Sequence, residues 1–112
     1  MTLREKQSLF VALVADLITH AHSLGYDLTF GEAWRSPEEA VRLAKAGKGI
    51  AKSLHCDRLA LDLNLFKDGI YLRGTEAHRT LGLWWEGLND LCSWGGRFGD
   101  GGHYSLSHGG RK

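Results

Sequence analysis

The stretch from Leu59 to Phe66 constrains the fold of this chain more than any other feature, because apolar and other side chains alternate along it. Successive side chains of a β-strand point to opposite faces, so the leucines at odd positions share one face. The opposite face is formed by Ala60, Asp62 and Asn64. This pattern predicts a half-buried strand that carries a carboxylate.

Asp62 needs a partner in such a strand, because an unpaired carboxylate that loses its water costs several kcal/mol. His55 precedes the strand and can reach back toward Asp62 if Cys56–Arg58 form a turn. One imidazole and one carboxylate supply two of the three protein ligands of a catalytic zinc site. Backbone amides, Arg35 or Arg97 are alternative partners for this carboxylate, and the sequence alone leaves them open.

The residues before this strand predict two helices with a strand between them. Thr2 and Glu5 have the spacing of a capping box, and apolar residues then recur at helical intervals. Pro37 suits the first position of a later helix. The expected elements are a helix over residues 3–23, a strand over residues 26–34 and a helix that is capped by Ser36 and ends at Gly47.

The residues after this strand predict a hairpin and a third helix. Lys67-Asp68-Gly69 is a turn sequence that returns the chain as an antiparallel neighbour. Thr75 is the expected cap of a helix that runs to about Asp90, with His78 on or near its solvent-facing side. From Ser93 onward glycine dominates, which is typical of a backbone that wraps closely around a site.

These elements predict a single domain over residues 1–112, with an α+β fold, a small, mainly antiparallel sheet and packed helices. Trp85 is expected in the core. A position at a cleft rim, where a tryptophan can stack on a sugar, is the alternative for Trp85 or Trp94.

Charge and composition exclude several classes of function. Lys and Arg number 14 against 13 Asp and Glu, so no strong field draws nucleic acid or an anionic membrane. No stretch has the length of a membrane span, and the amino-terminal residues lack the features of a secretory signal. We therefore expect a monomer that is made in the cytoplasm and neither binds nucleic acid nor inserts into a membrane. Two free cysteines fit that compartment.

The glycine-rich segment offers a third metal ligand and a base. If His103 joins His55 and Asp62, a bound Zn²⁺ keeps a fourth position open for water, as catalytic sites do. Asp100, three residues before His103, can then take the proton of this water and later hand it to a leaving amine. Arg35, at a strand end, can hold the oxyanion or a substrate carboxylate.

Each of these residues also has a simpler explanation. Asp100 is a common turn residue among glycines. Arg35 can pair with Glu32 or Glu38 on the surface. His108 is an alternative to His103 as a ligand, but no acid stands three residues before it. Cys56 is a further candidate ligand, although free cysteines are more often simply buried.

The spacing of five residues resembles the zinc D-Ala-D-Ala peptidase family, which shares its fold with the hedgehog signalling domain. These residues are Ser53 and His55, Asp62 with an alanine two positions before it, and Asp100 shortly before His103. The likeness is greatest to the short, phage-encoded branch that includes the L-alanyl-D-glutamate endolysins, and it covers nearly the whole chain. Two residues depart from the family pattern: Arg58 stands where a glycine is usual, and Gly102 where a proline is frequent.

The resemblance implies a function and a role for each site residue. It implies zinc on His55, Asp62 and His103, Asp100 as general base and acid, Arg35 as a stabiliser of the polarised carbonyl, and Ser53 as a substrate contact. The expected activity is hydrolysis of a peptide bond in the peptidoglycan stem peptide, with the bond from L-Ala to D-Glu favoured.

Two other functions are alternatives. One is a D-Ala-D-Ala carboxypeptidase or dipeptidase, and the other is a zinc-containing binding module without turnover. Because no secretory signal is recognised, we expect an enzyme of this kind to reach the cell wall only after the inner membrane is breached.

Overall fold

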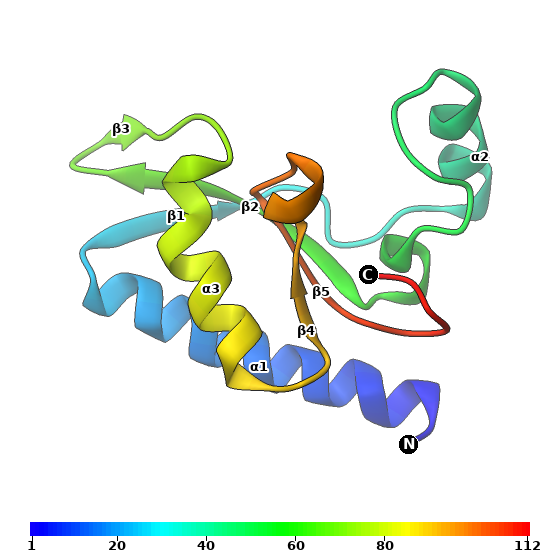
Figure 1. Ribbon diagram of the computed structural model, residues 1–112, viewed down its shortest axis with the longest axis horizontal. Coiled ribbons are helices and arrows are strands. Elements are labelled where there is room, and N and C mark those ends of the chain that lie inside the picture. Colours follow the sequence, from blue (N-terminus) through cyan, green and yellow to red (C-terminus); the bar gives the residue numbers. More distant parts are fainter.

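Strand β2 (Ala60–Lys67) lies at the centre of the molecule, as the alternating leucines predict (Figure 1). The structure is a computed structural model that describes residues 1–112. Its sheet has the strand order β1-β2-β5-β4, with β3 paired to the far end of β2, and every pairing is antiparallel. The predicted α+β fold with a small antiparallel sheet is therefore confirmed. The other elements are α1 (Leu3–Ser23), β1 (Tyr26–Phe30), α2 (Pro37–Lys45), η1 (Leu54–Asp57), β3 (Ile70–Tyr71), η2 (Glu76–His78), α3 (Arg79–Leu88), β4 (Cys92–Trp94), η3 (Gly95–Phe98) and β5 (His103–Leu106).

The two faces of β2 differ as predicted. Its leucines at odd positions are buried in a core to which α1, α3 and β5 also contribute. Phe10 of α1 and Tyr104 of β5 both meet the ring of Trp85 of α3 edge to face. Asp62, on the other face, is only partly buried. Hydrophobic burial therefore fixes the register of β2 and sets which way its carboxylate points.

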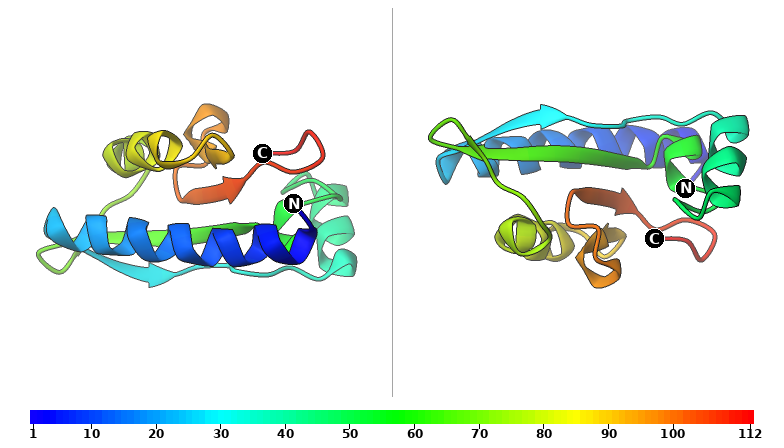
Figure 2. Two further views of the ribbon diagram at one scale, coloured as in Figure 1. Left: turned by 90° about the horizontal axis from the view of Figure 1, so that it is seen from below. Right: turned by 90° about the horizontal axis from the view of Figure 1, so that it is seen from above.

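Two of the three α-helices pack together on the core, and the third lies apart from them. Helices α1 and α3 contact each other and share the core, whereas α2 stands apart at one end of the molecule, toward which both termini also lie (Figures 1 and 2). The predicted capping box of Thr2 and Glu5 is present in α1. Ser36 caps α2 through its side chain, as predicted. No helix combines the length and the apolar character needed to cross a membrane.

Strand β1 ends earlier than expected, at Phe30 instead of Trp34. At Gly31 the chain passes so close to β2 that a Cβ atom would lie 3.0 Å from Cβ of Asp62. Two backbone hydrogen bonds continue beyond the strand, from Gly31 N–H to the Asp62 carbonyl and from Asp62 N–H to the Glu32 carbonyl. The segment that follows β1 is therefore tied to the Asp62 backbone without regular strand geometry.

The third helix departs from the prediction at its beginning. Its first turn is the 3₁₀-helix η2, and Thr75 makes no side-chain capping bond. His78, expected near solvent, is buried, and its Nδ1 lies 2.9 Å from the Tyr104 hydroxyl. The expectation of an exposed His78 is wrong because η2 turns this side chain toward β5.

Trp85 and Trp94, the two tryptophans considered for a cleft rim, belong to the core. Trp85 and Trp94 are almost completely buried, so neither forms a cleft rim. The Nε1–H of Trp94 donates a hydrogen bond to the Gly101 carbonyl over 2.7 Å. Trp94 therefore supports the loop that leads into β5.

Candidate metal centre

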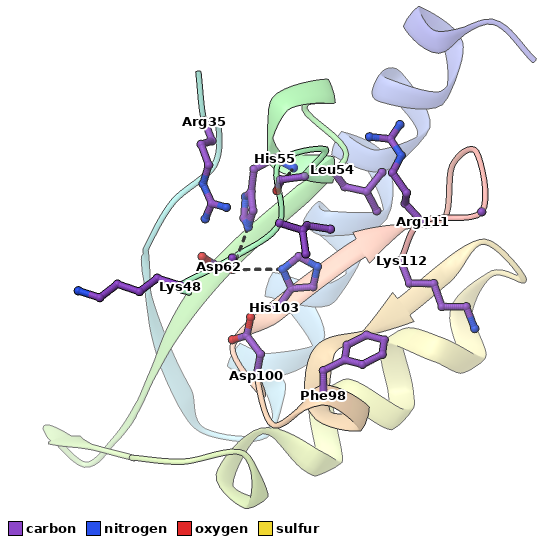
Figure 3. A pocket seen from close by; sticks show the side chains of 14 residues that line it. Arg35, Lys48, Leu54, His55, Asp62, Phe98, Asp100, His103, Arg111 and Lys112 are labelled. Atoms are coloured by element: carbon purple, nitrogen blue, oxygen red, sulfur yellow. Dashed lines mark hydrogen bonds and ion pairs between the residues drawn. The ribbon is translucent and has the colours of Figure 1, made fainter. Parts of the chain in front are cut away.

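All six predicted site residues line one cavity of about 780 Å³ (Figure 3). They come from segments that are far apart in the sequence and that the sheet brings together. The six are Arg35, Ser53, His55, Asp62, Asp100 and His103.

Asp62 and His103 are direct cross-strand partners in β2 and β5. Partners of this kind point to the same face of a sheet. Nδ1 of His103 lies 3.5 Å from Oδ1 of Asp62. The antiparallel register therefore brings His103, the predicted ligand of the glycine-rich segment, next to the strand carboxylate.

His55 reaches the same carboxylate from η1. Its Nε2 lies 3.3 Å from Oδ1 of Asp62, and the side chain is only 3% exposed. Ser53 caps η1, because its hydroxyl accepts a hydrogen bond from the His55 N–H. The turn closes at Arg58, which adopts a left-handed conformation with φ of 56°. A turn is thus present where His55 needs one to approach Asp62. Arg58 adopts the left-handed backbone conformation that usually favours glycine.

The three side chains fit a metal ion. One ligand atom from each of His55, Asp62 and His103 lies within 4.8 Å of the other two. Oδ1 of Asp62 is buried and accepts no hydrogen bond, which is costly unless a cation or another donor satisfies it. Ligand atoms about 2 Å from a tetrahedral ion lie about 3.3 Å from one another. The two distances to Asp62 match this spacing, and two histidines with one carboxylate suit Zn²⁺.

Burial and neighbouring charges shift the pKa values of Asp62 and Asp100 in opposite directions. Burial alone would raise the pKa of Asp62, but the imidazoles of His103 and His55 more than offset it and hold the pKa well below its usual range. Burial and the negative charge of Asp62 raise the pKa of Asp100. Asp62 is therefore the ionised member, as a metal ligand must be, and Asp100 is the carboxyl group better suited to proton transfer.

Asp100 lies beside His103 at the mouth of the ligand cluster (Figure 3). Its backbone is fixed by bonds on both sides: its N–H donates to the Gly95 carbonyl, and its carbonyl accepts from the His103 N–H. Asp100 does form a turn among glycines, which was its simpler explanation. That turn leaves the carboxyl group lining the cavity.

Arg35 lies on the opposite wall of the cavity. Its Nε and Nη2 both contact Oε1 of Glu32 at 2.6 Å, so the pairing with Glu32 that the sequence left open is present. This pair is not a surface pair, because the Arg35 side chain is only 13% exposed. Its guanidinium points toward the ligand cluster (Figure 3).

The two other candidate ligands lie outside the cluster. Nδ1 of His108 contacts the Lys6 ammonium at 3.1 Å. Sγ of Cys56 lies 4.0 Å from the Ser36 carbonyl. Neither residue belongs to the group of side chains that converge on Asp62.

Sequence reasoning missed two contributions to the site. Glu32, which appeared only as a surface partner of Arg35, also faces Nδ1 of His55 at 3.9 Å. Lys48 and the last three residues line the cavity; Lys48 and Lys112 add positive charge to it, whereas Arg111 is paired with Asp57 at 2.6 Å. For Glu32, the only signal in the sequence was its spacing of three residues from Arg35. For Lys48 and the last three residues, the sequence held no signal.

Comparisons with known proteins support the fold. No protein-family model matches the chain, and no curated protein sequence matches it. Among solved structures, the crystal structure of the L-Ala D-Glu endopeptidase ChiX from Serratia marcescens is similar, with a TM-score of 0.73. The match covers 88% of this chain and 77% of that chain at 17% sequence identity. At this identity the likeness shows a shared fold, which agrees with the peptidase-like fold expected from the motif spacing.

Proposed function

We propose that this chain is a zinc-dependent peptidase that cleaves a bond in the peptidoglycan stem peptide, with the L-Ala to D-Glu bond as its target. The observation that carries the proposal is the convergence of His55, Asp62 and His103 beside Asp100 in one cavity. The fold shared with an L-Ala D-Glu endopeptidase supports the same reaction.

The metal would be held by His55, Asp62 and His103. Zn²⁺ bound there supplies a Lewis acid for the substrate carbonyl and lowers the pKa of a water molecule. Asp100 accepts a proton from the attacking water and delivers it to the nitrogen of the leaving amine, a task that suits a carboxyl group with a raised pKa. Arg35 stabilises the negative charge that develops on the carbonyl oxygen.

The charge of the cavity favours an acidic peptide. Four cationic side chains line it, of which Arg35 is paired with Glu32 and Arg111 with Asp57, and Asp62 is committed to the metal in this proposal. Asp100 is then the only other side-chain carboxylate among the lining residues. The cationic residues are Arg35, Lys48, Arg111 and Lys112. A substrate with a free carboxylate next to the scissile bond, such as one with D-Glu on the leaving side, is complementary to this wall.

Mass spectrometry of fragments released from purified sacculi tests the proposal. Cleavage between L-Ala and D-Glu releases peptides that begin with D-Glu and leaves L-Ala on the glycan. Release of D-Ala alone would indicate a D-Ala-D-Ala carboxypeptidase instead, and release of nothing would indicate a binding module without turnover. The Asp100→Ala variant is the matched control, because it removes the base and keeps all three metal ligands.

A further inference from the structure

Glu32 is an acidic residue that lies next to both a proposed metal ligand, His55, and the proposed catalytic residue Arg35. Its Oε1 lies 2.6 Å from two nitrogens of Arg35 and 3.9 Å from Nδ1 of His55. We propose that Glu32 is a positioning residue of the metal centre. It orients the His55 imidazole from the Nδ1 side, away from Asp62, and it holds Arg35 at the wall of the cavity. This inference rests on the proposed function for its catalytic part and on the metal site alone for its binding part.

The Nδ1 atom of His55 is the first reason for this assignment. It is buried and has no hydrogen-bond partner, while Nε2 of the same ring faces Asp62. A histidine that binds a metal through one nitrogen usually presents the other to a carboxylate, a carbonyl or water. Glu32 provides the carboxylate that Nδ1 faces within ion-pair distance. Its negative charge favours a proton on Nδ1, which leaves Nε2 free to bind a metal.

The backbone around Glu32 gives the second reason. The Glu32 carbonyl accepts the N–H of Asp62 over 2.9 Å, and the N–H of Arg35 donates to the His55 carbonyl over 3.3 Å. The segment after β1 is therefore bonded to the backbones of two ligand residues. These bonds fix the backbone that carries Glu32, and they remain when only its side chain is changed.

A second ion pair with the same spacing shows what an ordinary surface pair looks like. Glu76 and Arg79 also lie three residues apart, and their contact is 2.7 Å. Both of these side chains are well exposed, and Glu76 makes no contact with a ligand residue. Glu76→Gln is therefore a matched control, because it removes a comparable charge pair away from the metal centre.

The test measures Zn²⁺ affinity of the full chain, by competition with a chromogenic chelator after removal of bound metal. Glu32→Ala is expected to weaken Zn²⁺ binding by about 10- to 100-fold, the usual effect of losing such a partner. Glu32→Gln is expected to recover part of this loss, because its amide oxygen can still accept the hydrogen bond from Arg35 and face Nδ1 of His55, but carries no charge. Glu76→Gln is expected to bind as the wild type does.

Two further readings separate positioning from structural damage. Thermal unfolding of the metal-free proteins is expected to be the same for Glu32→Gln and the wild type. Arg35→Ala is expected to keep its Zn²⁺ affinity while losing turnover of sacculi, because only the catalytic half of the arrangement is removed.

Three results would overturn the inference. One is wild-type Zn²⁺ affinity in Glu32→Ala. Another is a loss of Zn²⁺ affinity in both Glu32 variants that is accompanied by an equal loss of thermal stability in the metal-free proteins, because such a loss would reflect damage to the fold. The third is a wild-type chain that binds no Zn²⁺, which would remove the metal centre as well. If the wild type binds Zn²⁺ and Glu32 behaves as expected, but sacculi stay intact, the proposed peptidase function fails while the positioning role stands.

Discussion

Arg58 shows how a single residue can replace a glycine at a demanding position. It closes the turn that carries His55 with φ of 56°, a conformation that costs a residue with a side chain about 1–2 kcal/mol. Its guanidinium lies 5.1 Å from the ring centre of Trp34, within the range of a cation–π contact. The contact with Trp34 offsets part of the backbone cost, so the turn forms without a glycine.

Replacing Arg58 in two ways separates these effects. Arg58→Ala and Arg58→Gly both lose the contact with Trp34, but only alanine keeps the unfavourable backbone conformation. We expect Arg58→Gly to be more stable than Arg58→Ala by about 1 kcal/mol, after allowing for the greater chain entropy of unfolded glycine. Urea unfolding of the two variants measures the difference. Equal stabilities would mean that the left-handed turn is not strained.

His78 makes stability depend on pH. Burial lowers the pKa of His78 in the folded chain, whereas the unfolded chain has the ordinary value of about 6.5. As the pH falls below that value, the unfolded chain takes up the proton first, so the free energy of unfolding decreases. We expect this loss to be smaller in His78→Gln, which can still bond to Tyr104 but does not titrate. Urea unfolding of both proteins at about pH 7.5 and pH 5 tests this, and parallel losses would contradict it.

At the level of elements, α3 and β4 meet through an indole ring. A Cβ atom at Gly82 of α3 would lie 2.1 Å from Cδ2 of Trp94, so the ring fits only against a glycine. The same ring supports the Gly101 carbonyl, in the loop between Asp100 and His103. The packing of α3 is thereby connected to the site.

Two alanine substitutions in α3 should have opposite effects. Alanine is favoured over glycine in a helix by about 1 kcal/mol, and Gly87 has no atom within reach of a new Cβ. We expect Gly87→Ala to stabilise the chain by up to about 1 kcal/mol. At Gly82 the displacement of Trp94 outweighs this gain, and we expect a net loss of about 1–3 kcal/mol. Denaturant unfolding compares the two, and a stabilised Gly82→Ala variant would show that the ring moves freely.

The elements that the sequence predicted are those with a long local pattern. Helix α1 and strand β2 each repeat their period over several residues, so their bounds and faces follow from the sequence. Strand β4 has only three residues, too few to show alternation, and it exists because β5 pairs with it. The proposed role of Glu32 also depends on the fold, because the pairing of β1 with β2 and the bond from the Arg35 N–H to the His55 carbonyl bring it near His55. The approach of His103 to Asp62 was predicted, but its cause, the direct cross-strand pairing, appears only in the sheet.

Across the molecule, the three proposed ligand residues connect η1, β2 and β5. A metal ion that binds only the folded chain therefore stabilises it, by about 2.7 kcal/mol when the free ion is at about 100 times its dissociation constant. We expect Zn²⁺ to raise the unfolding temperature of the wild type and to leave that of Asp62→Ala unchanged. Asn64→Ala, on the same face of β2, is the control and should respond as the wild type does. A Zn²⁺ response in Asp62→Ala would place the ion elsewhere.

We expect this chain to digest peptidoglycan through a metal held beside Asp100. Release of soluble fragments from purified sacculi, with and without a chelator, tests it most directly when the Asp100→Ala variant is assayed alongside. We predict lysis by the wild type, its loss with the chelator, its recovery when Zn²⁺ is added back, and no lysis by Asp100→Ala. Lysis that the chelator leaves unchanged, or full lysis by Asp100→Ala, would contradict the claim.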